Sequence, residues 1–197
     1  PRQGIVKAVL FWSYAVMFLL RTIVGLTWKV EGRENLPRGA FLVASKHQSA
    51  WETLTFHILV PEVAVCLKDE LTRIPVFGWY LMRAGSIRID RGAAARAIRS
   101  LVLGAKRATA EGLSVQIYPE GTRRGVTDPP DYKPGVMALY GALRLPVVPV
   151  ALNSGLFWPR HGLIRRPGRI TVEFLPPIPA GLERKLFMHE LETTIET

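Results

Sequence analysis

A histidine and a glutamate stand five positions apart in the stretch SKHQSAWET, residues 45–53. A histidine beside a carboxylate suits general-base chemistry, in which the imidazole takes a proton from a substrate hydroxyl and the carboxylate orients the ring. If residues 47–52 were all helical, His47 and Glu52 would lie about 140° apart around the helix axis. The two side chains can meet only if His47 lies in the loop before a helix and Glu52 lies in its first turn.

The same stretch has a second interpretation as a helix start. Ser49 and Glu52 have the spacing of a capping box, in which the two residues satisfy each other's free backbone amides. Glu52 would then cap Ser49 without any part in catalysis. The sequence alone leaves both interpretations open.

The stretch IYPEGTRRG, residues 117–125, predicts an anion-binding loop at the end of a strand. Ligands of α/β proteins bind at the carboxyl ends of the strands, where Glu120 and the residues after it would lie. Gly121 allows a close approach of the backbone, Thr122 supplies a hydroxyl, and the forked guanidinium of Arg123 suits a phosphate. The alternative is a polar loop held by a structural Glu–Arg ion pair.

The stretch GSIRIDRG, residues 85–92, forms a second element of this kind. Strand alternation places Arg88 and Asp90 on one face of the strand. Arg91 therefore belongs to the following turn, where it is free to point at a ligand.

The elements that must position these residues alternate between short β-rich runs and helical stretches. Strands are predicted at 27–32, 40–45, 63–68, 86–90, 147–152 and 169–177, and a strand running into a loop at 113–121. Helices are predicted at 75–85, 93–110 and 134–143, with one more opening at Ser49 and another from about Gly181 onward. This alternation predicts an α/β fold with a mixed, mostly parallel central sheet flanked by helices. The run 169–177 is expected to close the sheet.

The N-terminal region is unusually apolar. Thirteen residues separate Lys7 from Arg21, and of these only Ser13 and Tyr14 are polar. A helix of that length reaches about 20 Å, short of a bilayer's hydrocarbon core of roughly 30 Å. Because aromatic residues are frequent here, we expect membrane-associated helices in residues 1–28, lying in the interface, followed by one α/β domain in residues 29–197. A buried core helix is the alternative.

Composition narrows the classes of partner. The formal net charge of +10 favours a polyanion or an anionic membrane surface, but no nucleic-acid motif is present and no nucleic-acid partner is expected. The single Cys66 excludes an internal disulfide and reads as a buried apolar residue, since no histidine stands beside it in sequence. No cysteine–histidine spacing is typical of zinc, so no metal is expected.

Taken in order, KHQSAWET, GSIRIDRG, IYPEGTRR and VVPVAL resemble the four sequence blocks of the lysophospholipid acyltransferase family, especially of 1-acylglycerol-3-phosphate acyltransferases. The likeness covers roughly residues 30–155. It departs from the family at one position, because Glu52 stands where the family usually has Asp.

The resemblance implies transfer of an acyl chain from an acyl thioester, of coenzyme A or of acyl carrier protein, to the free sn-2 hydroxyl of lysophosphatidate. His47 would be the general base and Glu52 its orienting carboxylate, without a bound cofactor. The implied substrate-binding residues are Lys68, Arg88, Arg91, Glu120, Gly121, Thr122 and Arg123. The enzyme would work at a membrane, with its site on the cytoplasmic side of a bacterial inner membrane.

Two alternatives remain beside this expectation. In the first, the acceptor has a different headgroup, as in a lyso-ornithine lipid or another lysophospholipid. Alternatively, the protein binds anionic lipid without catalysis, although the presence of both His47 and Glu52 disfavours that.

Overall fold

The structure, a computed structural model, describes residues 2–72, 82–89, 94–161 and 164–196. Its centre is a sheet with the strand order β1-β7-β6-β2-β5-β3-β4. The strands are β1 (Leu26–Glu31), β2 (Leu42–Ser45), β3 (Val63–Lys68), β4 (Ile87–Ile89), β5 (Ser114–Ile117), β6 (Val147–Leu152) and β7 (Gly168–Phe174). Among these described strands, every neighbouring pair is parallel except β6 and β7. The mixed, mostly parallel sheet predicted from the sequence is confirmed.

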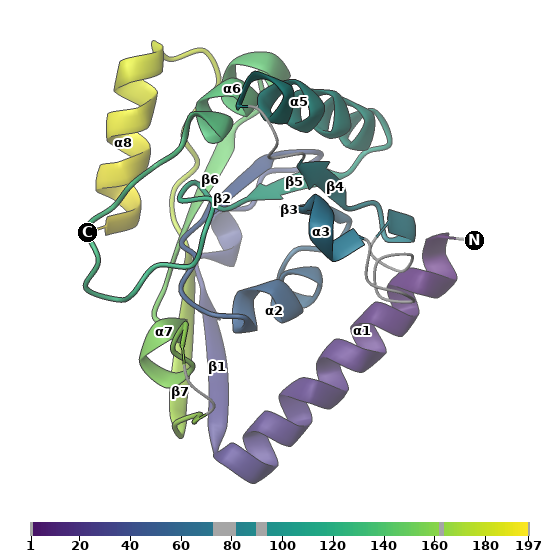
Figure 1. The fold of residues 1–197 in the computed structure, drawn as a ribbon, viewed down its shortest axis with the longest axis vertical. Helices are drawn as coiled ribbons and strands as arrows, with labels where there is room; N and C mark the ends of the chain where they lie inside the picture. Colours follow the sequence, from purple (N-terminus) through teal and green to yellow (C-terminus); the bar gives the residue numbers. More distant parts are fainter. Residues whose placement is uncertain (1, 73–81, 90–93, 162–163, 197) are drawn as a thin grey trace.

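Helices cover both faces of this sheet (Figure 1). They are α1 (Arg2–Leu19) with the π-helical η1 (Leu20–Val24), α2 (Trp51–Leu59), α3 (Asp69–Thr72), α5 (Ala94–Ala110), α6 (Pro134–Leu143), α7 (Ser154–Phe157) and α8 (Arg184–Glu196), with a 3-10 turn η2 (Arg33–Asn35). On one face, α5, α6 and α8 pack on apolar residues of the strands, including Leu42, Val115 and Val147. On the other face, α1 and α2 cover Val43, Val65 and Val148.

Strand alternation divides the two cores. Successive residues of β2 turn Leu42 to one core and Val43 to the other, as expected for a strand buried on both faces. In α5 the small residues Ala105 and Ala108 are buried beside Leu101, while arginines occupy the opposite side, as its amphipathic pattern predicted. Pro134 begins α6 at a position where its missing amide costs nothing.

The run 169–177 was expected to close the sheet, but its strand β7 lies inside, between β1 and β6. That position arises because β1, from the beginning of the chain, pairs with β7 and takes the edge. The helix predicted over 75–85 falls mostly outside the described residues.

The N-terminal segment is one continuous helical run from Arg2 to Val24. The run ends at Gly25, whose backbone is left-handed. It packs on α2 through buried Val9, Ser13 and Met17. Its other side carries exposed Phe11, Trp12, Tyr14, Phe18, Leu19 and Ile23. Residues Gly4–Val24 are long and apolar enough to cross a membrane, as judged by length and composition.

Candidate active site

Three neighbouring parallel strands deliver the candidate residues to one edge of the sheet. Ser154 follows the carboxyl end of β6, His47 that of β2 and Glu120 that of β5. These three strands are neighbours in the order β6-β2-β5. Helix α2 begins six residues after β2 and brings Glu52 to the same place in its first turn. This is the edge at which open α/β sheets bind their ligands.

His47 lies in the loop before α2, and Glu52 lies in the first turn of that helix, as the chemical interpretation required. The imidazole Nδ1 is 3.6 Å from Oε2 of Glu52, which is longer than a hydrogen bond. The Nδ1 atom is buried and has no hydrogen-bond partner among the described residues. The ring stacks on Tyr118, with centroids 3.7 Å apart and planes 13° from parallel.

The Glu52 carboxylate is completely buried and accepts several hydrogen bonds. Its Oε1 accepts from the amides of Gln48 and Ser49, each at 3.0 Å, and from the hydroxyl of Ser154. Its Oε2 also accepts from the Ser49 amide, and the Ser49 hydroxyl accepts in turn from the amide of Trp51 at 2.9 Å. Glu52 therefore makes the capping contact and faces His47 at the same time.

The loop 118–124 holds the backbone of His47 on both sides. The His47 amide donates to Oε2 of Glu120 at 3.1 Å, and its carbonyl accepts from the Arg124 amide at 2.8 Å. Gly121, whose φ of +64° is left-handed, permits the turn in which its amide bonds the Tyr118 carbonyl. The loop thus fixes the main chain that carries the imidazole.

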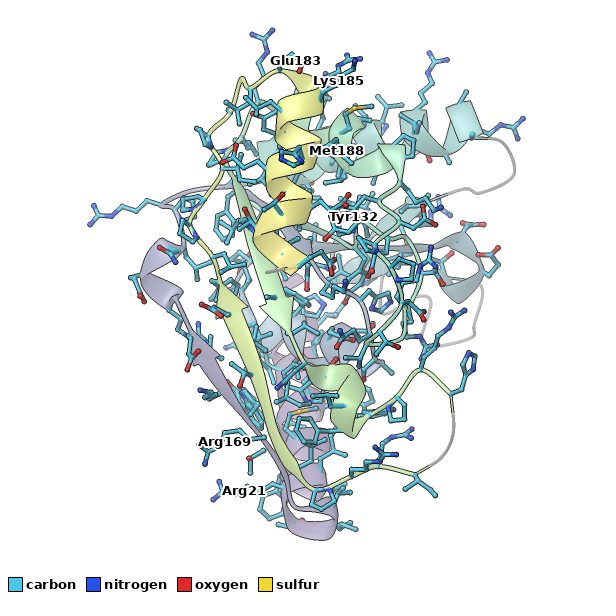
Figure 2. The ribbon with its side chains drawn as sticks, turned by 90° about the vertical axis from the view of Figure 1, so that its left-hand side faces the viewer. Arg21, Tyr132, Arg169, Glu183, Lys185 and Met188 are labelled. Carbon is cyan, nitrogen blue, oxygen red and sulfur yellow. The ribbon has the colours of Figure 1, made fainter. Side chains whose placement is uncertain are left out.

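Glu120 is buried and shares a cation with the C-terminal helix. Its Oε1 lies 3.5 Å from Nζ of Lys46, which also bonds the carboxylate of Glu196. Burial raises the pKa of Glu120, whereas the Lys46 charge and the His47 amide act in the opposite direction. Tyr132 donates to Glu196 at 3.0 Å, and in Figure 2 it lies near the lower part of α8.

The two arginines of this loop differ in their contacts. Arg124 pairs with Asp131, which also contacts Lys133 at 2.6 Å. Arg123 is half-buried and, within the described residues, forms no ion pair. Of these two arginines, only Arg124 has an acidic partner among the residues that the structure describes.

The remaining predicted site residues lie further away or outside the description. Arg88 is on the edge strand β4, is mostly exposed, and lies 3.7 Å from Asp69. No described contact joins it to the His47 group. Thr122 is half-buried in the loop 118–124. Arg91 and the side chain of Lys68 fall outside the described residues.

Sequence reasoning missed Lys46, Tyr118 and Ser154. Ser154 had a usable signal, since it follows a predicted strand at the ligand-binding edge. Lys46 and Tyr118 lie inside the motifs at residues 45–53 and 117–125, but their partners are far away in the sequence: Lys46 meets Glu196, 150 positions later.

Comparison with known proteins gives this arrangement a family. The model of the Acyltransferase family matches residues 27–153, which is 127 of the 197 residues. The chain belongs to the Acyltransferase family.

Relatives of this acyltransferase include the 1-acyl-sn-glycerol-3-phosphate acyltransferase of Pseudomonas aeruginosa. The two are 35% identical over 185 residues, or 94% of this chain and 72% of the relative. The protein of the same name from Saccharomyces cerevisiae is 29% identical over 174 residues, and the match spans only 57% of its length. The family blocks seen in the sequence are thus confirmed by similarity along most of the chain.

The acyltransferase also shares its fold with a solved structure, the 1-acyl-sn-glycerophosphate acyltransferase PlsC from Thermotoga maritima. The TM-score is 0.75, with 98% of this chain and 78% of that chain aligned. At 23% identity, this likeness concerns the fold.

Proposed function

We propose that this acyltransferase moves an acyl chain from an acyl thioester, of coenzyme A or of acyl carrier protein, to the sn-2 hydroxyl of lysophosphatidate. The product is phosphatidate. The observation that carries the proposal is the His47 imidazole facing the Glu52 carboxylate at the carboxyl edge of the sheet. The names of the bacterial and yeast relatives support this acceptor.

His47 acts as the general base. Its Nδ1 faces Glu52, which leaves Nε2 for the acceptor hydroxyl. As Nε2 takes the proton, the acceptor oxygen attacks the thioester carbonyl carbon, the C–S bond breaks, and the leaving thiolate receives the proton from the imidazolium. No protein nucleophile is required, because the acceptor itself attacks. Cys66 suits no such role, since it is buried and burial raises the pKa of its thiol.

Glu52 stabilises the imidazolium and fixes the ring while it holds the start of α2. The 3.6 Å separation from Nδ1 shortens to a hydrogen bond once substrate is bound, since such contacts are often long in unliganded sites. Stacking on Tyr118 limits rotation of the ring to its own plane, so the shift is small. Burial and the Glu52 charge raise the pKa of Tyr118, which keeps that phenol neutral.

Arg123 binds the acceptor phosphate, together with Thr122 and Arg91. A guanidinium that forms no ion pair among the described residues can give both of its forked donors to phosphate oxygens. Glu120 and Lys46 hold the loop that positions His47. Arg88, which is paired with Asp69, has a smaller part in binding.

The exposed apolar side of α1 supports the part of the proposal that has the enzyme work at a membrane. The run Gly4–Val24 has 21 residues and a length of about 31 Å. Because Val9, Ser13 and Met17 pack on the domain, α1 lies along the membrane interface with Phe11 and Phe18 directed into the lipid.

The decisive experiment is an acyl-transfer assay with purified full chain, one acyl-CoA and a panel of lysolipids. We expect lysophosphatidate to be the best acceptor, ahead of lysophosphatidylcholine and lyso-ornithine lipid. His47→Ala should abolish transfer at an unchanged melting temperature. A preference for a phosphate-free acceptor, or a His47→Ala variant within tenfold of the parent, would overturn the proposal.

The adjacent arginines give a matched test of the phosphate site. Arg123→Ala should raise the KM for lysophosphatidate about tenfold or more, because a charge-assisted bond contributes about 1.5–3 kcal/mol. Arg124→Ala removes the same side chain from a residue already paired with Asp131, so it should lower stability more than it raises that KM. An effect of Arg123→Ala on the donor KM alone would assign Arg123 to the donor.

A further inference from the structure

Two long segments of the chain contain no acidic residue. Neither residues 1–30 nor residues 132–172 include a single Asp or Glu, although the chain has 16. The second segment carries four arginines within residues 160–169. The charge of +10 is therefore concentrated in these stretches of the sequence.

The fold brings the ends of these two segments together. Strand β1 pairs in parallel with β7, so that Leu26 lies opposite Gly168 and Thr27 opposite Arg169. The Gly168 amide donates to the Gly25 carbonyl at 3.1 Å. Figure 2 shows Arg21 and Arg169 at the same corner of the molecule. The corner lies where the apolar helix ends.

This basic corner consists of Arg21, Ile164, Arg165, Arg166 and Arg169. Arg21, Arg166 and Arg169 are exposed, and Ile164 is 78% exposed between the basic residues. The Arg165 guanidinium lies 4.1 Å from the centroid of the Trp158 ring. An exposed aliphatic side chain among cations suits the boundary between lipid headgroups and acyl chains.

The charge also changes sign along the paired strands. Glu31 and Glu173 lie opposite each other at the far ends of β1 and β7. The pair of strands is thus basic where it begins and acidic where it ends, so the positive end has a defined direction.

That basic end of β1 and β7 lies toward the same edge of the sheet as His47, the edge at which β2 and β6 end. Strand β7 is antiparallel to β6, with Val172 opposite Leu152, the last residue of β6. Gly168 therefore extends four residues, or about 14 Å, beyond the carboxyl end of β6. His47 follows the carboxyl end of β2, the neighbour of β6 in the same direction.

We propose that the basic corner is a second membrane contact, which binds the anionic headgroups of a bilayer. It would turn the carboxyl edge of the sheet, with His47, toward the lipid. The inference rests on the membrane association proposed above, in which α1 supplies the apolar contact. The two contacts differ in chemistry, so they can be separated.

The test compares three double variants of the full chain on vesicles. Arg166→Glu/Arg169→Glu reverses the corner. Arg184→Glu/Lys185→Glu makes the same charge change at exposed positions at the beginning of α8, at the opposite end of the molecule (Figure 2). Phe11→Ser/Phe18→Ser weakens the apolar face of α1. Binding is measured by flotation with phosphatidylcholine vesicles and with vesicles containing 30% phosphatidylglycerol, at low and high salt.

The corner variant should lose tenfold or more of its affinity for the anionic vesicles, since each basic residue near such a surface contributes about fivefold. It should keep its binding to neutral vesicles, and the control variant should keep most of both. The α1 variant should instead lose neutral binding. Equal losses in the corner and control variants would mean that only net charge matters and would overturn the proposal.

Activity separates this inference from the proposed reaction. On a short-chain lysophosphatidate below its micellar concentration, the corner variant should turn over like the parent, whereas on acceptor embedded in anionic vesicles its rate should fall. Absence of transfer by the parent would refute the proposed function and leave the binding comparison intact. Loss of heparin binding with unchanged vesicle binding would assign the corner to a soluble polyanion instead.

Discussion

Two buried carboxylates, those of Glu52 and Glu120, hold the loop that carries His47, and their charges are stabilised in different ways. Glu52 is surrounded by donors without a formal charge: the amides of Gln48 and Ser49 and the hydroxyl of Ser154. Glu120 instead lies beside a cation, Lys46, and one of its oxygens accepts a hydrogen bond from the His47 amide. Glu52 faces the imidazole, whereas Glu120 holds the main chain beneath it.

The difference separates orientation of the ring from placement of the loop. Dipoles at a helix start stabilise the Glu52 charge without a counter-ion, so its negative charge remains available to an imidazolium. The charge of Glu120 is partly offset by Lys46, which also binds Glu196, so less of its field reaches the imidazole. Changes at Glu52 should therefore act on the rate constant, and changes around Glu120 should act mainly on stability.

Replacing Glu52 should have the largest effect on activity. Glu52→Gln keeps the capping bonds but removes the charge and favours the wrong imidazole tautomer, so kcat should fall by at least about 10²-fold. The melting temperature should stay within a few degrees. Glu52→Asp should recover part of the rate. Steady-state kinetics would contradict the assignment if Glu52→Gln were fully active, because Glu52 would then be a cap only.

Removing the cation beside Glu120 should chiefly destabilise the protein. Lys46→Met leaves the buried Glu120 charge unpaired, which typically costs about 3–5 kcal/mol of unfolding free energy. Urea unfolding should show that Lys46→Met/Glu120→Gln is more stable than Lys46→Met alone. Additive losses in this double-mutant cycle would mean that the two residues are not coupled. The rate of the single variant should fall by only about tenfold.

The Glu120 carboxyl should make stability depend on pH. Because burial raises its pKa above the ordinary 4.5, the folded state holds the proton more tightly than the unfolded state. That contribution is present below pH 4.5 and is lost as the pH rises through the folded pKa. As the pH rises through this range, the free energy of unfolding should fall more steeply for the parent than for Glu120→Gln. Identical slopes would show that Glu120 does not titrate in this window.

The smallest effect is expected at Ser154. Ser154→Ala removes one donor to Glu52, but both backbone amides still bond its Oε1. We expect a loss of about 1 kcal/mol in stability and a few-fold loss in kcat. A loss as large as that of Glu52→Gln would mean that the hydroxyl, and not the helix start, stabilises the carboxylate.

Local sequence patterns were sufficient to predict several helices and strands of the fold. Strand β3 was predicted with its observed bounds, and α5 and α6 within one residue, because each has a clear period and clear ends. The place of β7 was wrong, since pairing with β1 joins segments about 140 residues apart and leaves no local signal.

The site divides in the same way. The position of His47 before α2 followed from helix geometry, and the ambiguity of Glu52 was real because the carboxylate makes both contacts. The role of Glu120 in holding the His47 main chain was not predictable, since sequence alone does not distinguish a buried structural carboxylate on a loop from one that binds a ligand. Its partners Lys46 and His47 follow β2, and Lys46 in turn binds Glu196 of α8; only the folded chain brings these segments together.

The clamp on the His47 backbone has a consequence for the order of folding. Both hydrogen bonds come from a segment more than seventy positions later, so the first block of the motif has no fixed geometry until β5 has paired with β2. Such non-local pairing forms slowly and late. A nascent chain that has emerged only as far as α5 should hold His47 in a disordered loop, and catalytic competence should appear together with completion of the central sheet. Acyl transfer would then report, during refolding, on the last cooperative step more directly than helix content does.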